Sequence, residues 1–256
     1  MIANYHTHTW RCNHAEGRES EYVQCALRRG LQILGFSDHT PYIFPGEYYS
    51  TFRMKMTQLD DYVKTVQSLR EDYQGQIQIH LGLEAEFYPK FFPELLEILR
   101  DHSIEYLLLG QHFLGNEIGE PGSGNPTADA SILKRYCTQA MDAMQTGLFT
   151  YFAHPDLLNF QGDRRIYEQN MRRLCREANS CRIPLEINLL GLRNGRNYPN
   201  RVFLELAAEE GCRMVLGCDA HEPKALSDTS AEEKAMALTA EYGLEVLETV
   251  PLRPIR

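Results

Sequence analysis

The chain has 256 residues, a length typical of one α/β barrel, and we expect a single domain spanning residues 1–256. Its apolar share of 43% and charged share of 24% are ordinary for a globular protein and exclude a fibre or a disordered chain. The formal net charge of −9 argues against binding to nucleic acid, because proteins of that class concentrate Lys and Arg.

The sequence also bears on location and redox state. No apolar run approaches the roughly 18 residues needed to cross a bilayer, so we expect a cytoplasmic protein that does not enter a membrane. The seven cysteines are odd in number and lack C-x-x-C spacing, which indicates reduced thiols. The oligomeric state stays open.

Strands and helices alternate along the chain. Short apolar runs predict seven strands, at residues 2–8, 32–39, 77–84, 106–112, 149–154, 184–188 and 213–221. Amphipathic stretches predict helices at residues 19–29, 57–73, 93–101, 129–146, 165–180, 200–210 and 231–242. The last helix is expected to open with a capping box of Ser230 and Glu233 and to end at Gly243. Such alternation indicates a parallel sheet covered on both faces.

Every predicted strand finishes in polar side chains that could bind a metal or a substrate. In an open parallel sheet, only the strands beside the topological switch point would need such ends. In a closed barrel, all C-terminal strand ends converge on one mouth. The pattern therefore favours an α/β barrel with its site at the C-terminal mouth.

Histidines and acids dominate these strand ends. His6 and His8 are two residues apart, so on an extended strand both project to the same side. Seven histidines at strand ends are joined by two acids, and the candidate metal ligands are His6, His8, His14, His39, Glu84, His112, His154, Asp219 and His221. Imidazoles mixed with carboxylates suit Zn, Fe or Mn, and nine groups exceed the needs of one ion. We expect more than one divalent metal.

Neighbouring ions need a bridging carboxylate, and they form a centre for hydrolysis or phosphoryl transfer. Glu84 is our choice, because it is the first acid after Gly82 and Leu83. Glu86 points the same way under strand alternation and remains the alternative.

Six motifs together resemble the PHP superfamily of polymerase and histidinol-phosphatase metallohydrolases. The motifs are His6-Thr7-His8, Ser37-Asp38-His39, Gly82-Leu83-Glu84, Gln111-His112, Ala153-His154-Pro155 and Gly217-Cys218-Asp219-Ala220-His221. The segments Cys12-Asn13-His14 and Leu185-Glu186-Ile187-Asn188 look like the histidinol-phosphate phosphatase branch.

The resemblance implies a distorted, TIM-like (β/α)7 barrel with two to three divalent ions. One ion would take His6, His8, Glu84 and Asp219; a second would share Glu84 with His112 and His154; a third would take His14, His39 and His221. A hydroxide bridging two ions would attack phosphorus. The implied activity is a phosphoric monoester hydrolase that converts L-histidinol phosphate to L-histidinol and phosphate in histidine biosynthesis.

A small phosphorylated substrate also needs cationic donors, and guanidinium groups suit phosphate oxygens. Arg193 and Arg196 follow one strand and Arg164 follows another, so we expect these three to bind substrate. Asp38 is expected to orient a metal-binding histidine through a hydrogen bond to the ring nitrogen that does not bind metal. The groups assigned to catalysis are Glu84, Asp219, His221 and Asp38.

Two loops, residues 40–56 and 115–126, follow strands whose ends carry candidate ligands and are expected to overhang the mouth. Two other functions stay open. The same chemistry could act on a sugar phosphate, a nucleotide or a phosphotyrosine peptide. Alternatively, the chain could be a metal-binding PHP domain without turnover.

Overall fold

The computed structural model describes residues 1–255 and contains one parallel sheet whose strands follow chain order. The strands are β1 (Ala3–Asn4), β2 (Ile33–His39), β3 (Gln78–Ala85), β4 (Tyr106–Leu109), β5 (Phe149–Phe152), β6 (Leu185–Asn188), β7 (Arg213–Gly217) and β8 (Glu245–Leu247). Each strand pairs in parallel with the next.

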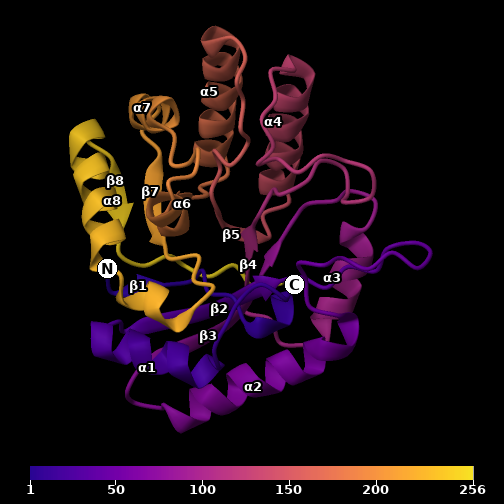
Figure 1. Cartoon of the computed structure of the whole chain (residues 1–256), viewed down its shortest axis with the longest axis vertical. Coiled ribbons are helices and arrows are strands. Elements are labelled where there is room, and N and C mark those ends of the chain that lie inside the picture. The colour runs from indigo at the N-terminus through magenta and orange to yellow at the C-terminus, as the bar shows by residue number, and fades with distance from the viewer. Residues whose placement is uncertain (256) are drawn as a thin grey trace.

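Helices surround this sheet, as Figure 1 shows, with α1 and α2 along one side, α4 and α5 on the opposite side and α3 between them. The helices are α1 (Glu19–Arg29), α2 (Leu59–Asp72), α3 (Phe92–Arg100), α4 (Ala130–Gln145), α5 (Arg164–Ser180), α6 (Leu189–Asn194), α7 (Arg201–Glu209) and α8 (Thr229–Tyr242). Three short 3-10 helices are η1 (Trp10–Cys12), η2 (Met56–Gln58) and η3 (Pro223–Ser227).

The TIM-like α/β barrel predicted from the sequence is confirmed, with an added short strand. The strand β8 lies beside β7 at one end of the sheet, and β1 lies at the other end. Beyond these strands, the segment after β1 pairs with the segment after β7, since the His8 N–H donates to the Ala220 carbonyl at 2.9 Å. The barrel mouth is therefore closed between the first and seventh strands.

All seven predicted strands and all seven predicted helices are present, although β1, β4 and β7 are shorter than predicted, and three further details differ. Strand β8 has three residues and helix α6 has six, too few to give a clear hydrophobic period. The predicted capping box at Ser230 is wrong. Helix α8 begins two residues earlier than predicted, and Asp228 caps it by accepting hydrogen bonds from the Ser230 and Ala231 N–H groups.

Strand alternation sends apolar side chains outward to the helices and polar ones inward. In β3, Leu81 and Leu83 belong to the core between sheet and helices, whereas Glu84 turns into the barrel. In β6, Ile187 packs outward and Glu186 turns inward. The inner and outer faces of each strand are thus set by its two-residue period.

The lower part of the barrel is filled by aromatic side chains. Tyr5, Tyr106 and Tyr151 are buried there in one cluster with Val250 from the C-terminal segment. The Tyr106 hydroxyl donates to the backbone carbonyls of Tyr5 at 2.7 Å and Phe36 at 3.1 Å, so its polar end is satisfied. This cluster of buried side chains supports the polar groups at the barrel mouth.

Candidate metal centre

Two imidazoles and two carboxylates meet where β1, β3 and β7 end. The rings of His6 and His8 lie 5.1 Å apart, and each Nε2 atom lies 3.5 Å from Glu84 Oε2. The same two nitrogens lie 3.6 and 3.1 Å from Asp219 Oδ1. All four side chains are buried. The structure therefore brings together the four groups expected around the first ion.

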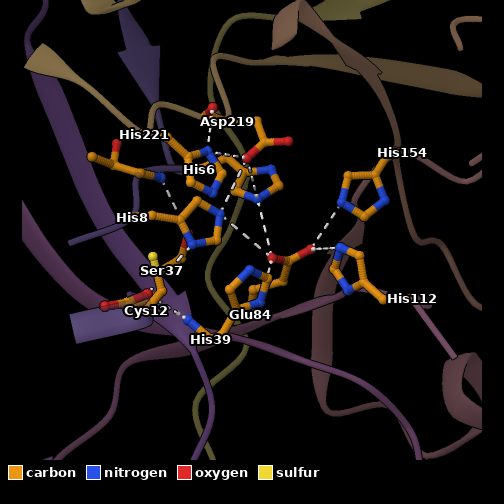
Figure 2. Close-up of polar contacts among 12 residues, drawn as sticks. His6, His8, Cys12, Ser37, His39, Glu84, His112, His154, Asp219 and His221 are labelled. Carbon is orange, nitrogen blue, oxygen red and sulfur yellow. Dashed lines mark hydrogen bonds and ion pairs between the residues drawn. The ribbon is translucent and has the colours of Figure 1, made fainter. Parts of the chain in front are cut away.

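The second oxygen of Glu84 faces another pair of imidazoles. Glu84 Oε1 lies 2.9 Å from His154 Nε2 and 3.8 Å from His112 Nε2. The two rings are 4.9 Å apart. Figure 2 shows the Glu84 carboxylate in the middle of the cluster, with contacts running to both sides. This is the geometry a bridging carboxylate requires.

A third group lies nearer the opening. The Nε2 atoms of His14 and His221 are 2.9 Å apart, and His39 offers a ring nitrogen within 4.8 Å of nitrogens on both. His39 Nδ1 is also 3.2 Å from Glu84 Oε2. The buried thiol of Cys12 lies within the same distance of ring nitrogens on His8 and His221, and sequence reasoning did not include it among the ligands.

Glu86, the alternative bridging residue, is engaged elsewhere. Its carboxylate accepts a hydrogen bond from His112 Nδ1 at 2.7 Å and pairs with Arg53 at 2.5 Å. The geometry therefore favours Glu84 as the bridging group and makes Glu86 a support for one imidazole.

Two further imidazoles are also backed by carboxylates. His6 Nδ1 lies 2.8 Å from Glu186 Oε1, and His8 Nδ1 lies 3.4 Å from Asp38 Oδ1. Both contacts orient the ring so that its Nε2 atom faces the centre. Asp38 lies where we expected an orienting group. The support from Glu186 was not predicted, although its place two residues before Asn188 on an inward face was a usable signal.

Glycines make room for the carboxylates of Glu84 and Glu186. A Cβ atom at Gly110 would lie 2.4 Å from Glu84 Oε1, and one at Gly217 would lie 1.7 Å from Glu186 Oε1. Any larger residue at these two positions would displace a carboxylate from its place against the imidazoles.

Two candidate ligands have strained backbones. His154 has φ of 34° and Asp219 has φ of 46°, in the left-handed region that residues with a side chain seldom adopt. Such a conformation costs on the order of 1–3 kcal/mol and is typical of functional sites. The His154 N–H donates to Glu186 Oε2 at 2.9 Å, which helps to hold that turn in place.

The donor set fits divalent metal ions. Among the buried atoms that lack a hydrogen-bond partner within residues 1–255, five lie together at this site: His6 Nε2, His8 Nε2, His39 Nδ1 and both oxygens of Glu84. Leaving such atoms unpaired is costly, with roughly 1–3 kcal/mol for each neutral group. All five face one another, so bound cations would satisfy them together.

Charges in the cluster shift the pKa values of its members strongly. Burial lowers the pKa of His8, but hydrogen bonds to Asp219 and Asp38 outweigh it and raise the pKa to about 9. Burial likewise opposes the effect of Glu186, Asp219 and Glu84 on His6, yet its pKa lies well above the usual value. Without metal, protons on these two rings therefore balance the buried carboxylates.

The acids shift in the opposite direction. Burial raises the pKa of Glu84, but His112, His6 and His39 outweigh it and hold the pKa well below the usual value. Asp219 is also buried, and His6 and His8 lower its pKa well below normal. Both acids are therefore ionised at neutral pH, the state in which carboxylates bind metals.

A cavity of about 420 Å³ opens directly above these groups. Its floor and walls are formed by His14, His39, Phe52, Glu84, His112, Phe113, Leu157, Leu190, Asn194, Arg196, Tyr198, Asp219 and His221. A second cavity of about 480 Å³ shares His112, Leu157, Arg196 and Tyr198 with the first. The two together leave room for a phosphate group and the organic part of a small ester.

The three arginines expected at the substrate site separate in the structure. Arg196 lines both cavities, and its guanidinium donates to the Tyr198 hydroxyl at 2.9 Å. Arg193 turns instead to the Cys218 carbonyl, at 2.8 Å. Arg164 lies at the start of α5 with its side chain 64% exposed, paired with Glu168. The structure therefore places Arg196 at the cavities, whereas Arg193 and Arg164 contact other partners and do not line them.

Comparison with known proteins gives a consistent result. Residues 4–189 match the profile of the PHP domain. The chain is 31% identical over 232 residues to a probable histidinol-phosphatase of Deinococcus radiodurans, covering 87% of each chain. It is 27% identical over 257 residues to a probable histidinol-phosphatase of Schizosaccharomyces pombe, covering 87% of this chain and 81% of that one.

Solved structures share the fold. The histidinol phosphate phosphatase of Lactococcus lactis, solved with zinc, L-histidinol and phosphate, has a TM-score of 0.76 and 21% identity, covering 97% of this chain and 96% of that one. A putative histidinol phosphatase of Listeria monocytogenes has a TM-score of 0.69 and 18% identity, covering 87% of this chain and 96% of that one.

None of the helices within residues 1–255 is long and apolar enough to span a membrane.

The pKa shifts predict how the metal-free protein responds to pH. His8 has a raised pKa in the folded state, so its contribution to stability is complete below about pH 6.5 and is lost as pH rises through about 9. We expect the melting temperature of chelator-treated protein to decrease as the pH is raised from about 6.5 to about 9. The melting temperature of metal-loaded protein should decrease much less over this range, because its imidazoles are already neutral. A metal-free melting temperature that stays level or rises over this range would contradict the assignment.

Proposed function

The chain belongs to the PHP domain family, and we propose that within it the protein is a metal-dependent phosphomonoesterase acting on histidinol phosphate. The observation that carries this proposal is the position of Glu84. Its two oxygens face separate sets of imidazoles on the floor of a cavity large enough for a small phosphate ester.

The ligand sets proposed for the metals follow the geometry. His6, His8, Glu84 and Asp219 would hold one ion, Glu84 with His112 and His154 a second, and His14, His39 and His221 a third. When bound, such ions lower the pKa of coordinated water and neutralise charge on phosphoryl oxygens. The pairs Glu186–His6, Asp38–His8 and Glu86–His112 would fix the rings that face them.

The reaction is a hydrolysis whose atoms balance without another reactant. A water oxygen forms a bond to phosphorus, the bond from phosphorus to the ester oxygen breaks, and a proton passes to that oxygen to give the alcohol. Arg196, which lines the cavity, would bind the phosphate. Phe52, Phe113 and Leu190 give an apolar wall beside the organic part of the substrate.

The choice of histidinol phosphate is supported by the names and similarity of the relatives. Leu190 lines the cavity and makes that part of its surface apolar. Planar aromatic side chains there could pack against an imidazole ring.

An assay across substrates tests the proposal. The chain is stripped with a chelator, reloaded separately with Zn²⁺, Fe²⁺ or Mn²⁺, and given histidinol phosphate, a sugar phosphate, a nucleotide and a phosphotyrosine peptide. We expect the highest kcat/KM with histidinol phosphate, and a loss of at least about 100-fold in Glu84→Gln, which keeps the size but removes the charge. Faster release from another ester would reject the substrate, and equal rates in metal-free protein would reject the chemistry.

Substitution of the arginines tests the phosphate contact separately. Arg196→Ala should raise KM for histidinol phosphate by about 10- to 100-fold, since a charged hydrogen bond contributes roughly 1.5–3 kcal/mol. The matched control is Arg164→Ala, which removes an exposed guanidinium from α5 and should leave both kcat and KM close to wild type. Steady-state kinetics that rank the two variants equally would remove Arg196 from the substrate site.

A further inference from the structure

A buried arginine lies between the candidate metal centre and the two loops that follow β2 and β4. Arg53 belongs to the loop of residues 40–56, and its side chain is 1% exposed. Its guanidinium contacts carboxylates from two other parts of the chain, Glu86 after β3 and Glu117 in the loop of residues 115–126. A cation this deeply buried is stable only with such partners.

One set of contacts connects Arg53 to the candidate metal ligand His112. Arg53 pairs with Glu86 Oε2 at 2.5 Å, and Glu86 Oε1 accepts from His112 Nδ1 at 2.7 Å. His112 Nε2 is thereby left facing Glu84. The guanidinium thus fixes the carboxylate that fixes the ring.

The other set of contacts joins the two loops. Arg53 Nε donates to Glu117, and Arg53 Nη1 donates to the Thr40 carbonyl at 3.2 Å. Glu117 also lies 3.3 Å from the Tyr48 hydroxyl. Both loops are therefore joined at one buried guanidinium.

The same side chain supports the cavity wall. The guanidinium carbon of Arg53 lies 4.5 Å from the centre of the Phe52 ring, and Phe52 stacks on Phe113 at 5.6 Å with an interplanar angle of 24°. Both aromatic residues line the 420 Å³ cavity. Phe52 belongs to the loop of residues 40–56, and Phe113 lies just before the loop of residues 115–126, so loss of the guanidinium would loosen the wall where the two segments meet.

We propose that Arg53 is a positioning residue that couples the order of the two loops over the cavity to the retention of metal at His112. Three donors in a fixed plane reach Glu86, Glu117 and the Thr40 carbonyl together. A lysine carries one compact charge and cannot hold all three partners in that geometry. The inference rests on the proposed metal centre but not on the identity of the substrate.

Variants of Arg53, Glu86 and Glu117 separate the contact with the metal ligand His112 from the contacts between the two loops. Metal-loaded protein is mixed with a chelator and the release rate is measured without substrate, while hydrogen exchange is followed in residues 40–56 and 115–126. Arg53→Lys should release metal about 10- to 100-fold faster and exchange faster in both loops. Glu86→Gln should act mainly on release. Glu117→Gln should act mainly on hydrogen exchange in the two loops.

The isosteric Gln variants keep the test decisive if Arg53→Lys does not fold. A destabilised control is Leu174→Ala, which opens a cavity in α5 away from the centre and should lower the melting temperature without changing metal release. The coupling is overturned if Arg53→Lys loosens the loops while release stays at the wild-type rate. It is also overturned if Leu174→Ala speeds release equally, or if wild-type protein holds no metal. Wild-type protein that retains metal but leaves histidinol phosphate intact rejects the substrate alone.

Discussion

The organisation of this protein depends on one fully buried carboxylate, that of Glu84. Placing an ionised acid inside a barrel is costly unless opposite charge surrounds it. Here the balance comes from five imidazoles at the ends of four different strands, which face its two oxygens from opposite sides. Parallel strands in chain order make this convergence possible, because their C-terminal ends all reach the same mouth. Gly110 then leaves the space that the carboxylate occupies.

A second layer of residues, made of acids, orients the imidazole rings around Glu84. Glu186, Asp38 and Glu86 each face the Nδ1 atom of one ring, so the Nε2 atoms point inward. Glu86 differs from the other two because Arg53 joins it to the loops above the cavity. Substrate access and metal binding thereby share one set of buried contacts. For the proposed hydrolysis, such a link would keep the loops beside the cavity ordered while metal is bound at the centre.

Much of this arrangement was predictable from the sequence. The alternation of strands and helices gave the barrel, the polar strand ends located the mouth, and the six motifs gave the family, which the profile match over residues 4–189 confirms. The predictions weakened where side-chain direction is set by tertiary contacts. Arg193, Arg196 and Arg164 all follow strand ends, but local partners separate them: Cys218 and Glu168 hold two, and Arg196 alone of the three lines the cavity. The role of Arg53 was hidden for the same reason, since its partners lie 33 and 64 residues away in the chain.

The central claim is that Glu84 lies between metal ions, and anomalous diffraction from a crystal of the metal-loaded protein tests it most directly. The account predicts at least two anomalous peaks, one beside His6, His8 and Asp219 and another beside His112 and His154. A different oxygen of Glu84 should lie about 2.0–2.2 Å from each peak if the metal is zinc. A single peak, or peaks that Glu84 does not contact, would contradict it.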